Sequence, residues 1–150
     1  MLNQFSRTEL LLGNEAMKKL AGARVAVFGI GGVGGYTVEA LVRSGLGAID
    51  LIDDDKVCLT NINRQIIATR KTVGKYKVDV AAERIHEINP DTIVNTYKTF
   101  YTPETAGEFD FSKYDYVVDA IDTVTGKIAL VMNANAAGTP IISSMGAGNK

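Results

Sequence analysis

A glycine-rich turn, set between an apolar run and a helical pattern, is the feature that most constrains what this chain folds into. The run GIGGVG at 29–34 follows a β-type segment at 24–28 and precedes a helical pattern at 36–44. Glycines let a backbone pass close to a phosphate, and a helix N-terminus offers free N–H groups and a partial positive charge. Tight packing is the alternative reason for the glycines, but the strand–turn–helix context favours a nucleotide-binding loop. Its lining residues would be Gly29, Gly31, Gly32 and Gly34.

The rest of the chain alternates between β-type runs and helical patterns, which indicates the fold class. Strands are expected at 24–28, 48–52, 92–97, 115–119 and 139–143. Helices are expected at 8–20, 36–44, 74–88, 103–109 and 125–137. Such alternation predicts an α/β fold, a Rossmann-like and mostly parallel sheet with helices on both faces. The 150 residues are enough for one domain, and a glycine turn directly after the last strand indicates the N-terminal portion of a longer protein.

Composition excludes several classes of function. The single cysteine, Cys58, rules out an internal disulfide framework and fits a cytoplasmic location, as does the lack of a signal-peptide pattern. No apolar run is long enough for a transmembrane segment. A formal net charge of −1 gives no basic footprint for nucleic acid over the chain as a whole. Cys58, between apolar Val57 and Leu59, is expected to be a small buried side chain, and His86 to face solvent.

Polar residues after the second expected strand indicate which nucleotide binds. The run DDDKVCLTNINRQ at 53–65 begins with Asp53, which is placed to hydrogen-bond a ribose hydroxyl. A nicotinamide enzyme has no use for Arg64, whereas phosphoryl or nucleotidyl chemistry does, because a planar guanidinium grips two phosphate oxygens. Lys77 lies near a helix start, where a solvated surface lysine is the alternative interpretation. Asp122 follows a strand, where a carboxylate is placed to hold Mg²⁺ on ATP phosphates.

Five ordered motifs resemble those of a known superfamily. They are GIGGVG at 29–34, D-x-D at 53–55, N-x-x-R-Q at 61–65, G-x-x-K at 74–77 and DAID at 119–122. Together they resemble the ubiquitin-activating-type adenylating enzymes, the ThiF/MoeB/HesA family, which includes activators of small sulfur-carrier proteins. The resemblance implies that 1–150 is an ATP-binding adenylating domain that uses ATP and Mg²⁺.

The resemblance also implies roles for individual residues in catalysis. Arg64 would contact the phosphates, and Lys77 would steady the α-phosphate as it is attacked. Asp122 would bind the magnesium ion.

Further contacts to the nucleotide are implied at residues that precede these three in the sequence. Asp53 would take the ribose, Asn61 would reach the phosphates, and Asp55 belongs to the same nucleotide-binding motif. Arg7 matches an N-terminal arginine of the superfamily that reaches the ATP of the partner subunit. The resemblance therefore implies a homodimer.

Within the superfamily, the chain most resembles the tRNA threonylcarbamoyladenosine dehydratases. The stretches that carry this likeness are FSR at 5–7, TNINRQ at 60–65, ERIHEINP at 83–90, DAIDT at 119–123 and MGAGNK at 145–150. The likeness implies that the free carboxylate of a threonylcarbamoyl group on tRNA adenosine attacks the α-phosphate of ATP and releases pyrophosphate. An internal nitrogen or oxygen then displaces AMP and closes a ring, so that tRNA is the implied substrate.

Other functions stay open at this point. The same chemistry could adenylate the C-terminus of a ubiquitin-like sulfur-carrier protein, with carrier or cysteine-desulfurase system proteins as partners. A nicotinamide-dependent oxidoreductase or a non-catalytic nucleotide sensor is the alternative from a different class. The near-neutral charge departs from what a tRNA partner usually requires. Either sequence beyond this segment carries a basic face, or a local cluster suffices, namely Arg64, Arg70, Lys71, Lys75 and Lys77.

Overall fold

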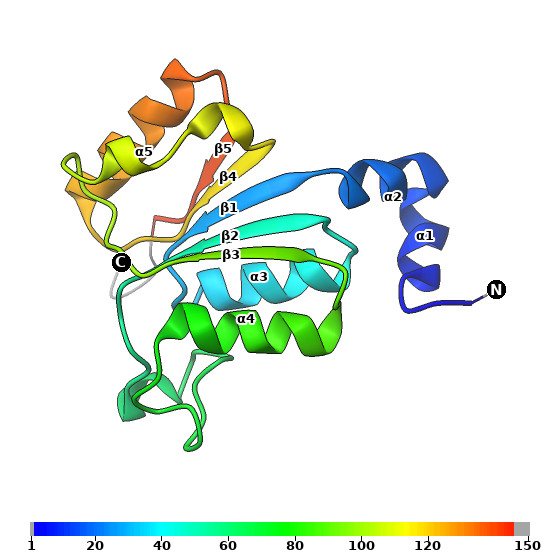
Figure 1. Ribbon diagram of the computed structural model, residues 1–150, viewed down its shortest axis with the longest axis horizontal. Coiled ribbons are helices and arrows are strands. Elements are labelled where there is room, and N and C mark those ends of the chain that lie inside the picture. Colours follow the sequence, from blue (N-terminus) through cyan, green and yellow to red (C-terminus); the bar gives the residue numbers. More distant parts are fainter. Residues whose placement is uncertain (1, 146–150) are drawn as a thin grey trace.

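The computed structural model describes residues 2–145, and this part of the chain forms one five-stranded sheet with helices on both faces (Figure 1). The strands are β1 Arg24–Phe28, β2 Ala48–Ile52, β3 Ile93–Tyr97, β4 Tyr116–Asp119 and β5 Ile141–Ser143. They lie in the order β3-β2-β1-β4-β5, and every neighbouring pair is parallel. The predicted Rossmann-like α/β fold is therefore confirmed.

Strands β1 and β2 are apolar along almost their whole length because both faces of the sheet are covered. On one face, α3 (Gly34–Arg43) and α4 (Lys77–Ile88) pack against β1 and β2. On the other face, α5 (Val124–Ala136) packs against β4 and β5, beside a cluster of aromatic side chains. Each face thus has its own apolar core, and the strand ends between them are free to present polar residues.

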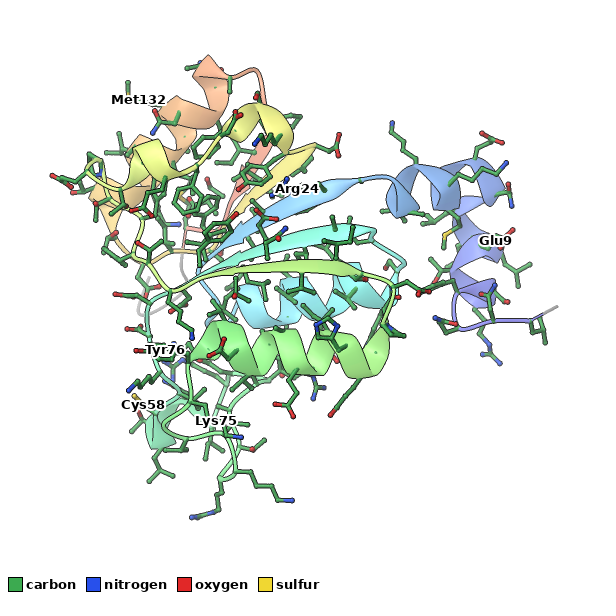
Figure 2. All side chains as sticks on the ribbon, viewed as in Figure 1. Glu9, Arg24, Cys58, Lys75, Tyr76 and Met132 are labelled. Atoms are coloured by element: carbon green, nitrogen blue, oxygen red, sulfur yellow. The ribbon has the colours of Figure 1, made fainter. Side chains whose placement is uncertain are left out.

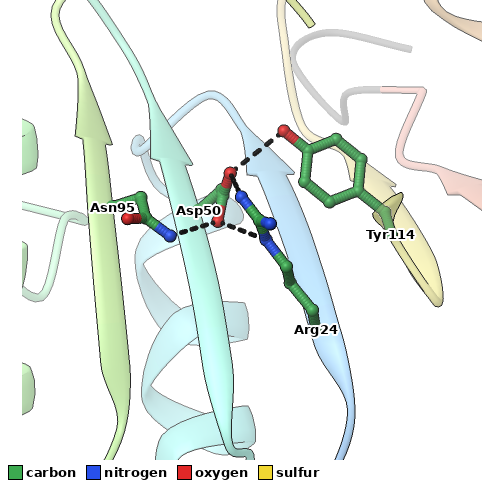
Figure 3. Close-up of polar contacts among 4 residues, drawn as sticks. All are labelled: Arg24, Asp50, Asn95 and Tyr114. Atoms are coloured by element: carbon green, nitrogen blue, oxygen red, sulfur yellow. Dashed lines mark hydrogen bonds and ion pairs between the residues drawn. The ribbon is translucent and has the colours of Figure 1, made fainter. Parts of the chain in front are cut away.

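One polar cluster is buried within the sheet itself (Figure 3). Asp50 in β2 is fully buried and accepts two hydrogen bonds from the Arg24 guanidinium, at 2.8 and 3.0 Å. Asn95 and the Tyr114 hydroxyl also donate to this carboxylate, each at 3.0 Å. Burial, together with the Asp50 charge, raises the pKa of Tyr114 well above its ordinary value. Full hydrogen bonding is what allows a charged group at this depth. The cluster joins β1, β2 and β3 to the residues that precede β4.

The N-terminal segment forms two short helices, and the expectation of one helix over 8–20 is wrong. The helices are α1 (Ser6–Leu12) and α2 (Asn14–Ala21), and neither has a buried residue. Gly13 separates them with φ 86°, a left-handed conformation that ends a helix and that glycine adopts without strain. Ala21 lies against Gly47, so this arm sits at the end of the sheet where β1 and β2 begin (Figure 1).

Two further boundaries differ from those expected. The helix expected over 74–88 begins only at Lys77, because Gly74 has φ 90° and pairs with Val57 rather than entering the helix. In place of a helix over 103–109, the chain makes one short 3-10 turn, η2 (Ala106–Glu108), and a second, η3 (Phe111–Lys113), follows it.

Two expectations from the sequence concern membrane insertion and the end of the chain. Within the described residues, no helix is long and apolar enough to cross a membrane. The glycine turn at 146–148 lies outside the described residues.

Candidate nucleotide site

The glycine-rich turn lies at the carboxyl edge of the sheet, at the point where the strand order reverses. Strand β1 has β2 on one side and β4 on the other, and ligands of open α/β sheets bind at such a switch point. The N–H of Gly29 donates to the carbonyl of Ile52 at 2.8 Å, and the N–H of Ala120 donates to that of Phe28 at 2.8 Å. The turn is thus fixed between the ends of β2 and β4.

Two of the four glycines in the turn are required by backbone packing. A Cβ on Gly29 would lie 2.5 Å from the carbonyl oxygen of Ala120, and the residue has φ 93°. A Cβ on Gly34 would lie 1.7 Å from the carbonyl oxygen of Gly29. Neither position has room for any side chain, so these glycines let the turn close on itself and on β4.

The other two glycines have no such reason to be glycine. The nearest atoms to a Cβ on Gly31 or Gly32 would be the Gln65 side-chain nitrogen and the Arg64 Cγ, each at an ordinary 3.7 Å. Neither residue is among the described glycines with positive φ. The missing side chains therefore leave open space above the turn, which is what close approach of a phosphate needs.

Asp53, at the end of β2, is hydrogen-bonded to the turn. Its two carboxylate oxygens accept the N–H groups of Ile30 at 2.7 Å and of Asp55 at 2.8 Å. Burial raises the pKa of Asp53, while these two hydrogen bonds and the charge of Lys77 act in the opposite direction. Asp53 thus holds the turn against β2. Its contact with a ribose hydroxyl stays a prediction. Each carboxylate oxygen has a second lone pair that could accept that hydrogen bond.

Lys77, the first residue of α4, is buried, so the interpretation as a solvated surface lysine is wrong. Its side chain is 8% exposed, and its Nζ lies 3.9 Å from the carboxylate of Asp55, which is 70% exposed. Its backbone N–H donates to the carbonyl of Asp55 at 3.0 Å. A buried ammonium with one distant and solvated partner is poorly compensated, and a phosphate would supply the missing charge.

Arg64 lies over the turn, with the aliphatic part of its side chain beside Gly32. Its guanidinium donates to the carbonyl of Thr60 at 3.2 Å and to the side chain of Asn63 at 2.9 Å. Among the described residues no carboxylate lies within ion-pair distance of it. Its positive charge is therefore available to an anion on the turn.

Asn61 lies in the turn that follows β2, where its side chain bonds to the backbone. Asn61 is buried, and its side-chain oxygen accepts the N–H of Cys58 at 2.8 Å, which stabilises the 3-10 turn η1 (Leu59–Asn61). Only its amide nitrogen is left to reach a phosphate, and that contact stays a prediction.

Cys58 is exposed, so the expectation of a buried side chain is wrong. The neighbouring Val57 takes the buried position instead, and Cys58 points the other way.

Asp122 is exposed in the loop after β4, two residues beyond Ala120, whose carbonyl abuts Gly29. No hydrogen bond or ion pair engages its carboxylate in the described part of the chain, and such a hard oxygen donor fits Mg²⁺. A second acidic group, Asp53, Asp54 and Asp55, has carboxylate oxygens within 4.8 Å of one another. Asp53 in this group already accepts two backbone N–H groups and Asp55 lies beside Lys77, whereas Asp122 has no such partner among the described residues.

Two site features were not predicted from the sequence. Gln65, next to Arg64, is buried beside Gly31, and its side-chain oxygen has no hydrogen-bond partner in the described structure. Its place in the N-x-x-R-Q motif was the available signal. Lys127 in α5 bonds both oxygens of the buried Asp119 carboxylate, at 3.1 and 3.2 Å, and the carbonyl of Ser144. No spacing in the sequence indicated that pair.

Arg7 is exposed on α1, at the opposite end of the sheet from the glycine turn (Figure 1). The structure brings Arg64, Asp53 and the loop of Asp122 against the turn, and Lys77 beside Asp55, but it does not bring Arg7 to this site within one chain. His86 is exposed, as expected.

A glycine turn with open space above it, with the poorly compensated Lys77 and the unpaired Arg64 at the carboxyl edge of a parallel sheet, is the arrangement expected of a nucleotide-binding α/β domain. The model of the ThiF family matches residues 5–150, and the chain belongs to this family.

Known proteins similar to this chain agree with that assignment. The chain is 50% identical, over its whole length, to a tRNA threonylcarbamoyladenosine dehydratase of Bacillus subtilis, and it spans 59% of that protein. It is also similar to crystal structures of the tRNA N6-threonylcarbamoyladenosine dehydratase TcdA of Escherichia coli, at 45% identity. The TcdA complex with ATP has a TM-score of 0.95, and the match covers 98% of this chain and 60% of that one. The complex with AMP has a TM-score of 0.94 over the same shares. The chain thus spans about three fifths of these relatives.

Proposed function

We propose that this protein uses ATP to dehydrate threonylcarbamoyladenosine in tRNA. The observation that carries the proposal is the open glycine turn with Arg64 above it and the buried Lys77 nearby, in a chain half identical to a dehydratase of this kind. The relatives crystallised with ATP and with AMP support the nucleotide assignment. A cytoplasmic location, which the sequence indicates, stays a prediction.

The proposed reaction has two steps. First, the threonylcarbamoyl carboxylate attacks the α-phosphorus of ATP; a new P–O bond forms, the bond to the β-phosphate breaks, and pyrophosphate leaves. Second, an internal N–H or O–H of the same group attacks the activated acyl carbon and gives up its proton to solvent; the acyl–phosphate bond breaks, and AMP leaves with the former carboxylate oxygen. The cyclised nucleoside has therefore lost the atoms of one water molecule relative to the starting nucleoside.

The residues of this chain would act on the first step by orientation and charge. Arg64 and Lys77 would donate to the oxygens of the α-phosphate, where negative charge builds up as the carboxylate attacks. Asn61 would donate its remaining amide N–H groups to the phosphates, and Asp53 would orient the ribose. Mg²⁺ held by Asp122 would neutralise charge on the triphosphate when bound.

The partner subunit would complete this site. Arg7 lies too far along the sheet to serve the turn of its own chain, and three neighbouring side chains on α1, Leu10, Leu11 and Leu12, are exposed by 86, 87 and 51%. Exposed apolar side chains next to one another favour a protein partner. A second copy that buries this face would bring Arg7 to the other subunit's ATP, in a homodimer.

ATP–pyrophosphate exchange tests the proposal directly. We expect exchange of labelled pyrophosphate into ATP that requires tRNA carrying threonylcarbamoyladenosine. The Arg64→Ala variant should lose it by a factor of about 100 or more, with its far-UV circular dichroism unchanged, because removing a donor to developing charge has costs of that order. The Arg70→Ala variant, on the same loop, should bind ATP like the wild type.

The outcomes separate the functions that the sequence left open. Exchange that depends on a sulfur-carrier protein instead of tRNA would assign the alternative substrate. Binding of NADH without binding of ATP–Mg²⁺ in isothermal titration would contradict the adenylation chemistry altogether. Undiminished exchange in Arg64→Ala would remove that residue from its proposed role.

A further inference from the structure

We infer that residues 56–78 form the surface that binds the phosphate backbone of the RNA substrate. This stretch is the part of the connection between β2 and α4 that follows the three aspartates at 53–55, together with the first two residues of α4. We call this region the basic excursion. The inference rests on the proposed function, because it assigns the residues that would hold that substrate next to the nucleotide site. In Figure 1 the excursion projects past α4, away from the sheet.

Charge in this protein is concentrated in the basic excursion. Six of the sixteen Lys and Arg residues lie within 56–78, and none of the seventeen Asp and Glu residues does. The rest of the chain therefore has ten cations against seventeen anions. The formal net charge of −1 conceals this separation. The six cations are Lys56, Arg64, Arg70, Lys71, Lys75 and Lys77.

The cations of the excursion are not neutralised by neighbouring carboxylates. Elsewhere in the described chain most basic side chains have an acidic partner, as Arg84 does with Glu39 and Lys98 with Asp79. Within the excursion Lys77 alone has one, at 3.9 Å. Arg70, Lys71 and Lys75 are exposed, and Figure 2 shows Lys75 in the loop region below α4. Exposed cations without partners create a local positive field that attracts a polyanion.

Hydrogen bonds hold the excursion in a defined shape. Its two arms pair where Val57 donates to the carbonyl of Lys75 and Gly74 donates to that of Val57, both at 2.8 Å. At the tip, the Thr72 hydroxyl accepts the N–H of Thr69 and donates to the carbonyl of Ile67, again at 2.8 Å.

Buried side chains anchor this shape to the body of the protein. Val57, Ile67 and Ala68 belong to the apolar core under α3 and α4. Arg70 and Lys71 therefore stand on a fixed turn. Binding a partner would cost less backbone ordering than it would for a disordered basic tail.

The array of cations is continuous with the nucleotide site, and this continuity favours RNA over other polyanions. Arg64 lies over Gly32 at one end, and Lys77 lies beside Asp55 at the base. An RNA backbone laid along the excursion would therefore direct its modified nucleoside toward the α-phosphate. An anionic membrane has no group that must reach the nucleotide.

The excursion supplies charge rather than base recognition. Its one aromatic ring, Tyr76, is already covered by the ammonium groups of Lys56 and Lys98, at 5.0 and 4.7 Å from the ring centre. No ring in this region is left for stacking with a base. We therefore expect contacts to phosphates, which position the RNA but carry little sequence information.

A pair of matched double variants tests the inference. The tip variant is Arg70→Gln with Lys71→Gln, and the control is Lys19→Gln with Lys113→Gln, two exposed lysines outside the excursion. Filter binding gives the Kd for tRNA at several KCl concentrations, and isothermal titration gives the Kd for ATP. We expect the tip variant to weaken tRNA binding about tenfold and to lower the slope of log Kd against log salt by about 1.5, since each phosphate contact contributes roughly 0.7–0.9. Its affinity for ATP should not change, and the control should match the wild type in both.

The results distinguish failure of this inference from failure of the proposed function. If the tip variant binds tRNA like the wild type, or if the control loses as much affinity, the excursion is not the RNA surface, while tRNA-dependent exchange would leave the proposed function standing. If the wild type binds no tRNA, both are overturned. Binding to phosphatidylserine vesicles that falls in the tip variant, with no binding of tRNA, would assign the surface to a membrane and overturn the inference.

Discussion

At the scale of single residues, the glycines of one turn serve two separate purposes. Gly29 and Gly34 have no space for a side chain because backbone carbonyls lie where a Cβ would be. Gly31 and Gly32 have that space, and no side chain of the described residues fills it. The first two positions are fixed by folding, and we propose that the other two are fixed by what binds above the turn.

This difference predicts opposite results for two alanine substitutions. Gly34→Ala should lower the free energy of unfolding by about 3 kcal/mol or more, because an overlap with backbone cannot be relieved by a side-chain rotation. Gly31→Ala should change it by less than about 0.5 kcal/mol, yet weaken ATP binding by about tenfold, since an added methyl group would crowd the phosphate. Urea unfolding and isothermal titration measure the two effects. Equal loss of stability in both variants would contradict this division.

Several residues could be assigned from the sequence because their motifs are ordered and local. The glycine turn, Asp53 and Arg64 lie within or directly after a strand–turn–helix unit, and the structure places them together. The burial of Lys77 could not be predicted, because it depends on the pairing of 55–57 with 74–77. The exposure of Cys58 likewise depends on which of two neighbours, Val57 or Cys58, faces the core.

At the scale of secondary-structure elements, one partly buried lysine joins the ends of three of them. Lys127 from the first turns of α5 bonds Asp119, the last residue of β4, and the carbonyl of Ser144, directly after β5. Asp119 also accepts the N–H of Ile121 at 3.2 Å. The loop that carries Asp122 is thereby held between α5 and the sheet.

Breaking this connection should destabilise the protein. Lys127→Met leaves the fully buried carboxylate of Asp119 without its partner, and we expect a loss of about 3–5 kcal/mol in urea unfolding. Replacing both residues, Lys127→Met with Asp119→Leu, should recover much of it, because no unpaired charge remains. The exposed Lys113→Met is the control and should cost less than about 0.5 kcal/mol. A Lys127→Met variant as stable as this control would show that the ion pair between Lys127 and Asp119 does not contribute to the stability of the protein.

The succession of strands and principal helices along the chain could be predicted from the sequence, since apolar runs and helical patterns alternate cleanly. What could not be predicted were the helix boundaries set by distant contacts. The arm at 8–20 is amphipathic in sequence, yet no residue of α1 or α2 is fully buried within one chain, and Gly13 divides the two helices. An amphipathic pattern shows that one face of a helix is apolar, but it does not show whether the same chain covers that face.

At the scale of the whole molecule, the arm and the nucleotide site lie at opposite ends of the sheet (Figure 1). A site that needs Arg7 must therefore borrow it from a second copy. Mixing two inactive variants tests this arrangement. Arg7→Ala and Arg64→Ala, unfolded and refolded together, should recover about a quarter of the wild-type exchange activity, because half of randomly paired dimers are hybrids and each hybrid has one intact site. Activity that stays absent in the mixture, with dimers present by analytical ultracentrifugation, would place Arg7 outside the partner's site.

The separation of charge described for the basic excursion also bears on how a partner arrives. Ten cations against seventeen anions leave the remainder of the chain negative, so that most of the molecular surface repels a polyanion while one projecting loop attracts it. An approaching RNA would be turned toward the correct side before any contact forms. The association rate, rather than the lifetime of the complex, should then be the quantity most sensitive to ionic strength.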